Sequence, residues 1–136
     1  MMQKIYHGID MVECSRMEQL AQRHKQRFFD RVFTKAELAY CNKYQKSYEH
    51  LAGRFAVKEA VMKILGTGWS DGISWQDIET RNTATGKPEV FLYNKASQIA
   101  NQMGIGEIAI SITHTGDLAM ASAVAIKQTH RQMEQM

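Results

Sequence analysis

The sequence contains one proline, Pro88, and two cysteines, Cys14 and Cys41, in 136 residues. The single proline excludes a proline-rich linker. The two cysteines lack the spacing of a metal site and are too few for a disulfide framework, so we expect free buried thiols in a reducing compartment. No apolar run approaches the roughly 20 residues that cross a bilayer, and the N-terminus lacks the apolar core of a signal peptide. These absences predict a cytoplasmic protein with no membrane partner.

A strong excess of one charge is also missing, since the net charge of the chain is only +3. The exception is the segment 16–35, where six basic residues stand against two acidic ones. This segment carries an excess of four positive charges, which leaves the rest of the chain at −1. A local basic face attracts an acidic partner or a polyanion. The alternative is a solvated helix face without a partner.

The hydrophobic pattern predicts an α+β fold in a single domain, residues 1–136, with a polar tail at 127–136. Thr34 and Glu37 have the spacing of a capping box at the start of a helix. The order of elements favours a mostly antiparallel sheet packed with a long central helix. The predicted strands are 5–12, 73–81, 89–93, 107–113 and 118–126, and the predicted helices are 13–27, 35–48, 53–66 and 95–103.

The central helix is apolar over most of its circumference, yet it carries Lys58, Glu59 and Lys63. At about 100° per residue these charges fall within an arc of roughly 140°. Because a charge removed from water must be paired or bound, we expect the arc to face a wet cleft, a subunit interface or a bound ion. The simpler alternative is a surface pair of Glu59 and Lys63, which stabilises a helix by about 0.3–0.5 kcal/mol.

A second acidic residue, Asp10, interrupts the otherwise apolar first strand. Two carboxylates from distant segments beside a lysine suit a hard cation such as Mg²⁺, which also binds substrate phosphates. The lysine then neutralises the remaining phosphate charge. The turn 66–68 exposes backbone N–H groups that can approach a phosphate, although such a turn is more often a plain helix stop. His114, at a strand end, is a candidate to bind a phosphate or to shuttle a proton, and the alternative is a surface or packing histidine.

Six sequence blocks carry a family resemblance that spans about residues 5–126. They are GIDMVE at 8–13, FxxRVFTxxE at 28–37, AGRFAVKEA at 52–60, KILGTG at 63–68, GKP at 86–88 and SITHT at 111–115. In this order they resemble the group I 4′-phosphopantetheinyl transferases, the holo-[acyl-carrier-protein] synthase family. The resemblance implies transfer of 4′-phosphopantetheine from coenzyme A to a serine of apo acyl carrier protein, with release of adenosine 3′,5′-bisphosphate, in fatty acid biosynthesis.

The resemblance also implies roles for individual residues. Asp10 and Glu59 would ligate Mg²⁺, and with Lys63 they would form the catalytic set. The coenzyme A site would be lined by Lys63, Gly66, Thr67, Gly68, Lys87, Pro88, Ser111, Thr113, His114 and Thr115. The acidic carrier protein would meet Arg16, Arg23 and Arg27. The family implies a homotrimer with active sites shared between subunits. The base that accepts the serine proton stays open among Glu59, a metal-bound water and a group on the carrier.

Three other interpretations are weighed against this one. The basic segment resembles a nucleic-acid surface if Phe28, Phe29 and Phe33 stack on bases. Their spacing suits core packing better, so we expect no nucleic-acid partner. A metal-dependent phosphohydrolase would use Asp10 and Glu59 without an acceptor protein. A transferase of the same family could also serve a different carrier domain.

Overall fold

The computed structural model describes residues 4–24, 26–66 and 72–127, and it confirms the predicted α+β class. The predicted tail lies outside the described residues, except that Lys127 belongs to the last strand. In chain order the elements are β1 (Lys4–Glu13), α1 (Cys14–His24), α2 (Gln26–Val32), α3 (Lys35–Cys41), α4 (Ser47–Leu65), η2 (Trp75–Asp77), β2 (Ile78–Asn82), β3 (Pro88–Leu92), α5 (Asn94–Gln102), β4 (Ile105–Thr115) and β5 (Leu118–Lys127).

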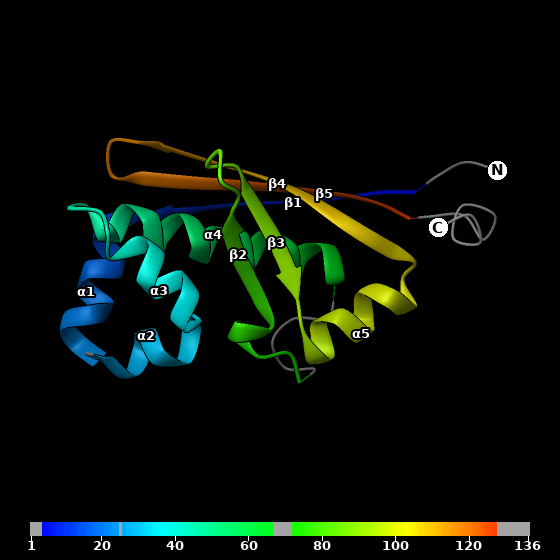
Figure 1. Ribbon diagram of the computed structural model, residues 1–136, viewed down its shortest axis with the longest axis horizontal. Coiled ribbons are helices and arrows are strands. Elements are labelled where there is room, and N and C mark those ends of the chain that lie inside the picture. The colour runs from blue at the N-terminus through cyan, green and yellow to red at the C-terminus, as the bar shows by residue number, and fades with distance from the viewer. Residues whose placement is uncertain (1–3, 25, 67–71, 128–136) are drawn as a thin grey trace.

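The strands form two antiparallel sheets rather than the one that the sequence suggested. One has the order β1-β5-β4, and β2 pairs with β3 in the other. In Figure 1 helix α4 runs beneath the three-stranded sheet, and the β2–β3 hairpin crosses α4. Helices α1, α2 and α3 gather at one end of the molecule, where the turn between β4 and β5 also lies. Among the described helices, none is long and apolar enough to cross a membrane.

The two faces of the three-stranded sheet differ sharply. On the face toward α4 the central strand β5 contributes only small residues, Ala119, Ala121, Ala123 and Ala125, all buried. Gly8 of β1 lies on this face as well, and a Cβ added there would stand 1.9 Å from the carbonyl oxygen of Ala60. Strand and helix therefore meet through backbone atoms, the close approach that a glycine in a strand permits.

The opposite face of this sheet carries large apolar side chains in contact with solvent. Ile5 is 69% exposed and Met11 is 59% exposed, and both belong to β1. Ile9, Leu118, Val124 and Ile126 are exposed on the same side. We call these six residues the outer sheet face. Exposed apolar patches of this kind are typical of interaction surfaces.

Helix α4 is buried nearly all round, as its apolar sequence predicted. It ends where expected, because Gly66 adopts the left-handed conformation with φ 74° and its N–H donates to the Met62 carbonyl. It begins earlier than predicted, at Ser47, although Lys46 offers no side-chain cap. Tertiary packing of residues such as Leu51 and Ala52 extends the helix beyond its local start signals.

Two predicted helices have different bounds in the structure. The described part of the helix expected over 13–27 belongs to α1 up to His24 and to α2 from Gln26, and α2 continues to Val32 with Phe28 and Phe29. Their rings pack against one another and against Phe33, so a tertiary contact sets the path of the chain. The helix expected over 35–48 ends at Cys41, and its predicted Thr34–Glu37 capping box is confirmed.

The strand expected over 73–81 begins only at Ile78. The single turn η2 precedes it because the Asp77 carboxylate accepts from the Ser74 N–H at 3.0 Å, which closes a local turn. Pro88 is the first residue of β3, the position at which a missing N–H is tolerated. Both cysteines are free and buried, as expected.

Candidate active site

Asp10 and Lys63 lie together where β1 packs on α4. The Lys63 ammonium is 3.5 Å from Asp10 Oδ1, and it donates to the carbonyl of Ile9 at 2.6 Å. The Asp10 side chain is 22% exposed and that of Lys63 is 54% exposed. The strand alternation places Asp10 on the same side as Gly8, toward the helix. The pair therefore sits at a solvent-accessible edge of the core.

Glu59 is half-buried. It lies on the turn of α4 that contacts β1, because the next residue, Ala60, is the one that Gly8 contacts. Two carboxylates thus flank the same strand–helix junction. No group of three or more His, Cys, Asp or Glu side chains suited to a metal occurs among the described residues. Mg²⁺ does not need three, because it is usually held by one or two carboxylates, waters and substrate oxygens. Joint ligation of one ion by Asp10 and Glu59 stays a prediction.

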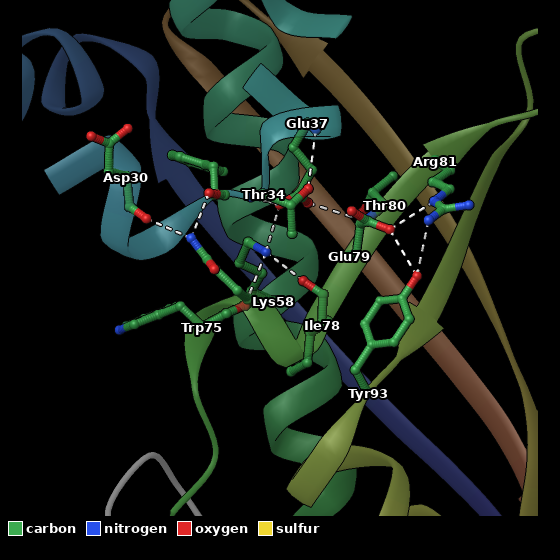
Figure 2. A network of polar contacts seen from close by, with 12 residues as sticks. Asp30, Thr34, Glu37, Lys58, Trp75, Ile78, Glu79, Thr80, Arg81 and Tyr93 are labelled. Carbon is green, nitrogen blue, oxygen red and sulfur yellow. Dashed lines mark hydrogen bonds and ion pairs between the residues drawn. The ribbon is translucent and has the colours of Figure 1, made fainter. Parts of the chain in front are cut away.

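Lys58 does not face a cleft, and for this residue the expectation from the charged arc was wrong. Its side chain is 0% exposed. Figure 2 shows its ammonium directed into the protein, where it donates to Glu37 Oε1 at 2.8 Å, to the Trp75 carbonyl at 3.0 Å and to the Ile78 carbonyl. An arc of 140° is wide enough for its two edges to face different neighbours. Lys58 points to α3 and β2, and Lys63 points to β1.

The Glu37 carboxylate joins three elements around this buried lysine. Oε1 accepts from the Thr34 N–H at 3.0 Å as well as from Lys58, and Oε2 accepts from the Thr80 N–H at 3.0 Å. Burial lowers the pKa of Lys58, and the attraction of Glu37 opposes that shift. The sequence identified Glu37 only as a capping residue. Nothing in its spacing to Lys58 signals the buried pair.

Arg54 is a further buried charge that sequence reasoning passed over, although it stands inside the AGRFAVKEA block. It is 3% exposed, it donates to Asn82 Oδ1 at 2.6 Å, and its guanidinium lies 4.3 Å from the centre of the Tyr40 ring. Asn82 in turn donates to the Gly86 carbonyl at 3.1 Å. Arg54 thereby fastens the β2–β3 turn, which carries the exposed Lys87, to α4.

The strand end 111–115 meets α4 near its beginning. His114 Nε2 lies 2.9 Å from the Glu49 carbonyl, and its ring packs edge-on to His50 at 5.8 Å between centroids. A Cβ on Gly53 would lie 3.2 Å from the same nitrogen. Gly53 and Ala60 are seven residues apart, so the two contact points are about 10 Å apart along the helix.

The residues predicted for coenzyme A therefore fall into two groups rather than one. Lys63 and Gly66 lie at the C-terminal half of α4, and the Gly66 N–H is already used in the helix stop. Thr67 and Gly68 lie outside the described residues. Lys87, Pro88, Ser111, Thr113, His114 and Thr115 belong to the two hairpins, and of these all but Pro88 are exposed. An extended ligand is needed to reach both groups.

The basic helices present their charges to solvent. Arg16, Arg23 and Arg27 are all exposed. The phenylalanines that follow these arginines are not arranged for stacking on bases, because Phe28 packs against Phe33 and Phe55, each at 6.5 Å between centroids. A shallow depression on this surface is lined by Arg23, His24, Gln26, Arg27, Phe28 and Arg31.

Comparison with known proteins identifies close relatives of this site and fold. The sequence-family model of the 4′-phosphopantetheinyl transferase superfamily matches residues 7–121 of this chain. A protein of Moorella thermoacetica named holo-[acyl-carrier-protein] synthase is 48% identical over 122 residues, which are 90% of this chain and 92% of that protein.

Two solved structures extend the comparison to three dimensions. The holo-[acyl-carrier-protein] synthase of Neisseria meningitidis has a TM-score of 0.80 at 33% identity and covers 88% of this chain and 96% of its own. The enzyme of Helicobacter pylori, solved in complex with coenzyme A, has a TM-score of 0.75 at 28% identity and covers 88% of this chain and 98% of its own. The resemblance inferred from the sequence blocks is confirmed.

Proposed function

Because the chain belongs to the 4′-phosphopantetheinyl transferase superfamily, we propose that it acts as a holo-[acyl-carrier-protein] synthase. It transfers the 4′-phosphopantetheine group of coenzyme A to a serine of apo acyl carrier protein. The observation that carries the proposal is the junction of β1 and α4, where Asp10 lies 3.5 Å from Lys63 and Glu59 occupies the adjoining helical turn.

The reaction is a phosphoryl transfer. The serine oxygen forms a bond to the phosphorus that carries pantetheine, the pyrophosphate P–O bond breaks, and adenosine 3′,5′-bisphosphate leaves while the serine loses its proton. Such a step needs positioning and charge neutralisation more than covalent help from the protein. The Lys63 ammonium, half-exposed and held by the Ile9 carbonyl, is placed to neutralise phosphate charge.

The donor set at the junction fits Mg²⁺. Asp10 and Glu59 are hard oxygen ligands, and the accessible edge leaves room for water and phosphate oxygens to complete the shell. These two side chains would hold the ion. When bound, the ion supplies charge neutralisation on the pyrophosphate and lowers the barrier to its cleavage. The position of Lys63 beside Asp10 adds a second positive charge to the same place.

Coenzyme A would extend from this junction toward the two hairpins. Lys87 and His114 lie on the two hairpins that are tied to the first half of α4, through Arg54 and the Glu49 carbonyl respectively. Both side chains are exposed and can meet the polar groups of the cofactor. Coenzyme A is also proposed to contact the turn at Gly66 and four further residues of the hairpins, Pro88, Ser111, Thr113 and Thr115.

The carrier protein would dock on α1 and the start of α2. Acyl carrier proteins are the acidic partner that the basic segment requires under this function. Arg16, Arg23 and Arg27 stand exposed, and the depression beside them adds His24, Phe28 and Arg31. A basic rim around a partly apolar depression suits a steered, transient encounter.

The outer sheet face is proposed to be covered by other copies of this chain. Ile5, Ile9 and Met11 of β1 share this face with the exposed apolar residues of β5, and nothing in the described chain covers them. We assign this face to the homotrimer that the sequence resemblance implies. An assembly of this kind places β1, and with it Asp10, near the subunit boundary.

A single assay tests the function. The purified protein is incubated with coenzyme A, Mg²⁺ and an apo carrier protein, and the carrier is weighed by mass spectrometry. A gain of one phosphopantetheine group is expected, with none when EDTA replaces Mg²⁺ or when the acceptor serine is changed to alanine. Phosphopantetheine released without a carrier would instead show a phosphohydrolase, and salt-sensitive binding of nucleic acid without Mg²⁺ would show a nucleic-acid protein.

A further inference from the structure

Helix α1, the proposed docking helix, has little capping of its own. The residue before it is Glu13, and its first turn contains no acidic side chain. The first N–H groups of any helix lack partners inside the helix and are normally satisfied by a nearby Ser, Thr, Asp or Asn. Ser15 and Glu18 have the spacing of a local capping box, but the Ser15 hydroxyl is used elsewhere.

One residue from the far end of the sequence supplies the missing partner. The Asp117 carbonyl accepts from the Cys14 N–H at 2.7 Å. Its carboxylate accepts from the Ser15 N–H at 3.0 Å through Oδ1 and from the Ser15 hydroxyl at 2.6 Å through Oδ2. A carboxylate at this position also interacts favourably with the positive end of the helix dipole. Three hydrogen bonds thus attach the start of α1 to the β4–β5 turn.

The same turn is anchored on its other side. His114, three residues before Asp117, contacts the Glu49 carbonyl at the start of α4. In Figure 1 the turn reaches over the end of the molecule where α1 lies. Asp117 therefore connects two parts of the protein that bind different substrates under the proposed function. They are the strand end with His114, for coenzyme A, and the helix with Arg16, for the carrier protein.

We propose that Asp117 is a positioning residue for the acceptor substrate. It holds α1 in a fixed place relative to the strand end 111–115, so that a carrier docked at Arg16 presents its serine to the bound coenzyme A. The proposal rests on the proposed function. Asp117 touches neither substrate in this scheme and acts only through the placement of α1.

The sign of the charge separates positioning from simple electrostatics. Asp117 is a negative charge next to a basic helix, and the carrier protein is acidic. Removing that charge would, by electrostatics alone, strengthen the attraction between helix and carrier. Loss of positioning predicts the opposite, a weaker productive encounter. An increase in the KM for the carrier after removal of Asp117 can therefore not come from the charge itself.

The test compares Asp117→Ala, Asp117→Asn and Glu18→Ala in the full chain. We expect Asp117→Ala to raise the KM for apo carrier about fivefold, with the KM for coenzyme A unchanged. A fivefold change corresponds to about 1 kcal/mol, the usual loss of stability when a helix cap is removed. Asp117→Asn keeps an oxygen for the Ser15 N–H and should restore most of the carrier KM. Glu18→Ala removes the same charge from exposed α1 and should leave the carrier KM equal or lower.

Hydrogen exchange gives a readout that does not depend on turnover. The first-turn amides of α1 should exchange faster in Asp117→Ala than in the wild type, while those of α4 stay protected. An unchanged carrier KM in Asp117→Ala, or equal rises in the KM for both substrates, would overturn the proposal. If the wild type itself fails to modify any carrier, the proposed function is at fault, and faster exchange would still establish Asp117 as the anchor of α1.

Discussion

Two lysines on the same helix, Lys58 and Lys63, have opposite surroundings. Lys58 is fully buried and donates to three oxygens, those of Glu37, Trp75 and Ile78. Lys63 is half-exposed, with one short hydrogen bond to Ile9 and a looser ion pair to Asp10. The first arrangement fixes α4 against α3 and β2. The second leaves a charge accessible to a ligand. One helix thus separates the groups that set the fold from those proposed to do chemistry.

The largest expected effect comes from removing the buried ion pair of Lys58 and Glu37. Lys58→Met should lower the free energy of unfolding by about 3–5 kcal/mol, because it leaves the Glu37 carboxylate buried without its charge partner. Urea denaturation measures this loss. Lys63→Met is the matched control, since the same substitution at an exposed position should change stability by no more than about 0.5 kcal/mol. Equal losses in the two variants would contradict the distinction between the lysines.

A substitution at the accessible junction of β1 and α4 should lower turnover and leave the fold intact. Glu59→Gln keeps the side-chain volume but removes the charge of a proposed metal ligand, so the rate of carrier modification should fall at least about a hundredfold. The midpoint of thermal unfolding should stay within about 2 °C of the wild type. Transfer at the wild-type rate would show that Glu59 has no part in the chemistry.

A smaller effect is expected at α1, the proposed docking helix. Arg16→Glu reverses a charge on the exposed face of α1 and should raise the KM for apo carrier about tenfold, with the KM for coenzyme A unchanged. Higher salt should reduce the difference between variant and wild type, because exposed charges are screened. Parallel losses for both substrates would place Arg16 outside the docking face.

The smallest effect concerns His50, which is half-buried and so lies between the two extremes. Burial lowers its pKa, helped by the nearby charges of Arg54 and His114. The folded state therefore binds fewer protons than the unfolded state just below the ordinary histidine pKa of about 6.5, and stability should fall as the pH drops through this range. Thermal unfolding between pH 8 and pH 5 should show a shallower loss in His50→Gln than in the wild type.

Local patterns predicted much of the fold from the sequence. The Thr34–Glu37 box and the Gly66 helix stop are signalled by residues close together in the sequence, and the structure has both. The helical run of α2 up to Val32 was missed because the packing of the Phe28 ring on Phe55, a contact distant in sequence, is not signalled by helix periodicity.

The candidate site was predictable to a similar degree. Asp10 and Lys63 were linked from the sequence because an acid in an apolar strand and a charge on a buried helix are both costly, and the structure brings them together. The partner of Lys58 was not predictable, since Glu37 is 21 residues away and already has a local role in the capping box. The support of Arg54 for the turn before Lys87 was missed for the same reason.

The contact between Gly8 and the Ala60 carbonyl has a consequence for the choice of metal. Residue 8 sets the clearance between β1, which carries Asp10, and α4, which carries Glu59. A bulkier residue there would spread the two carboxylates without altering either of them. Mg²⁺ demands short bonds of about 2.0–2.1 Å in a rigid octahedron, whereas Ca²⁺ accepts about 2.3–2.6 Å and irregular shells. Under the proposed function, in which Asp10 and Glu59 both bind the ion, Gly8 therefore favours Mg²⁺ over Ca²⁺.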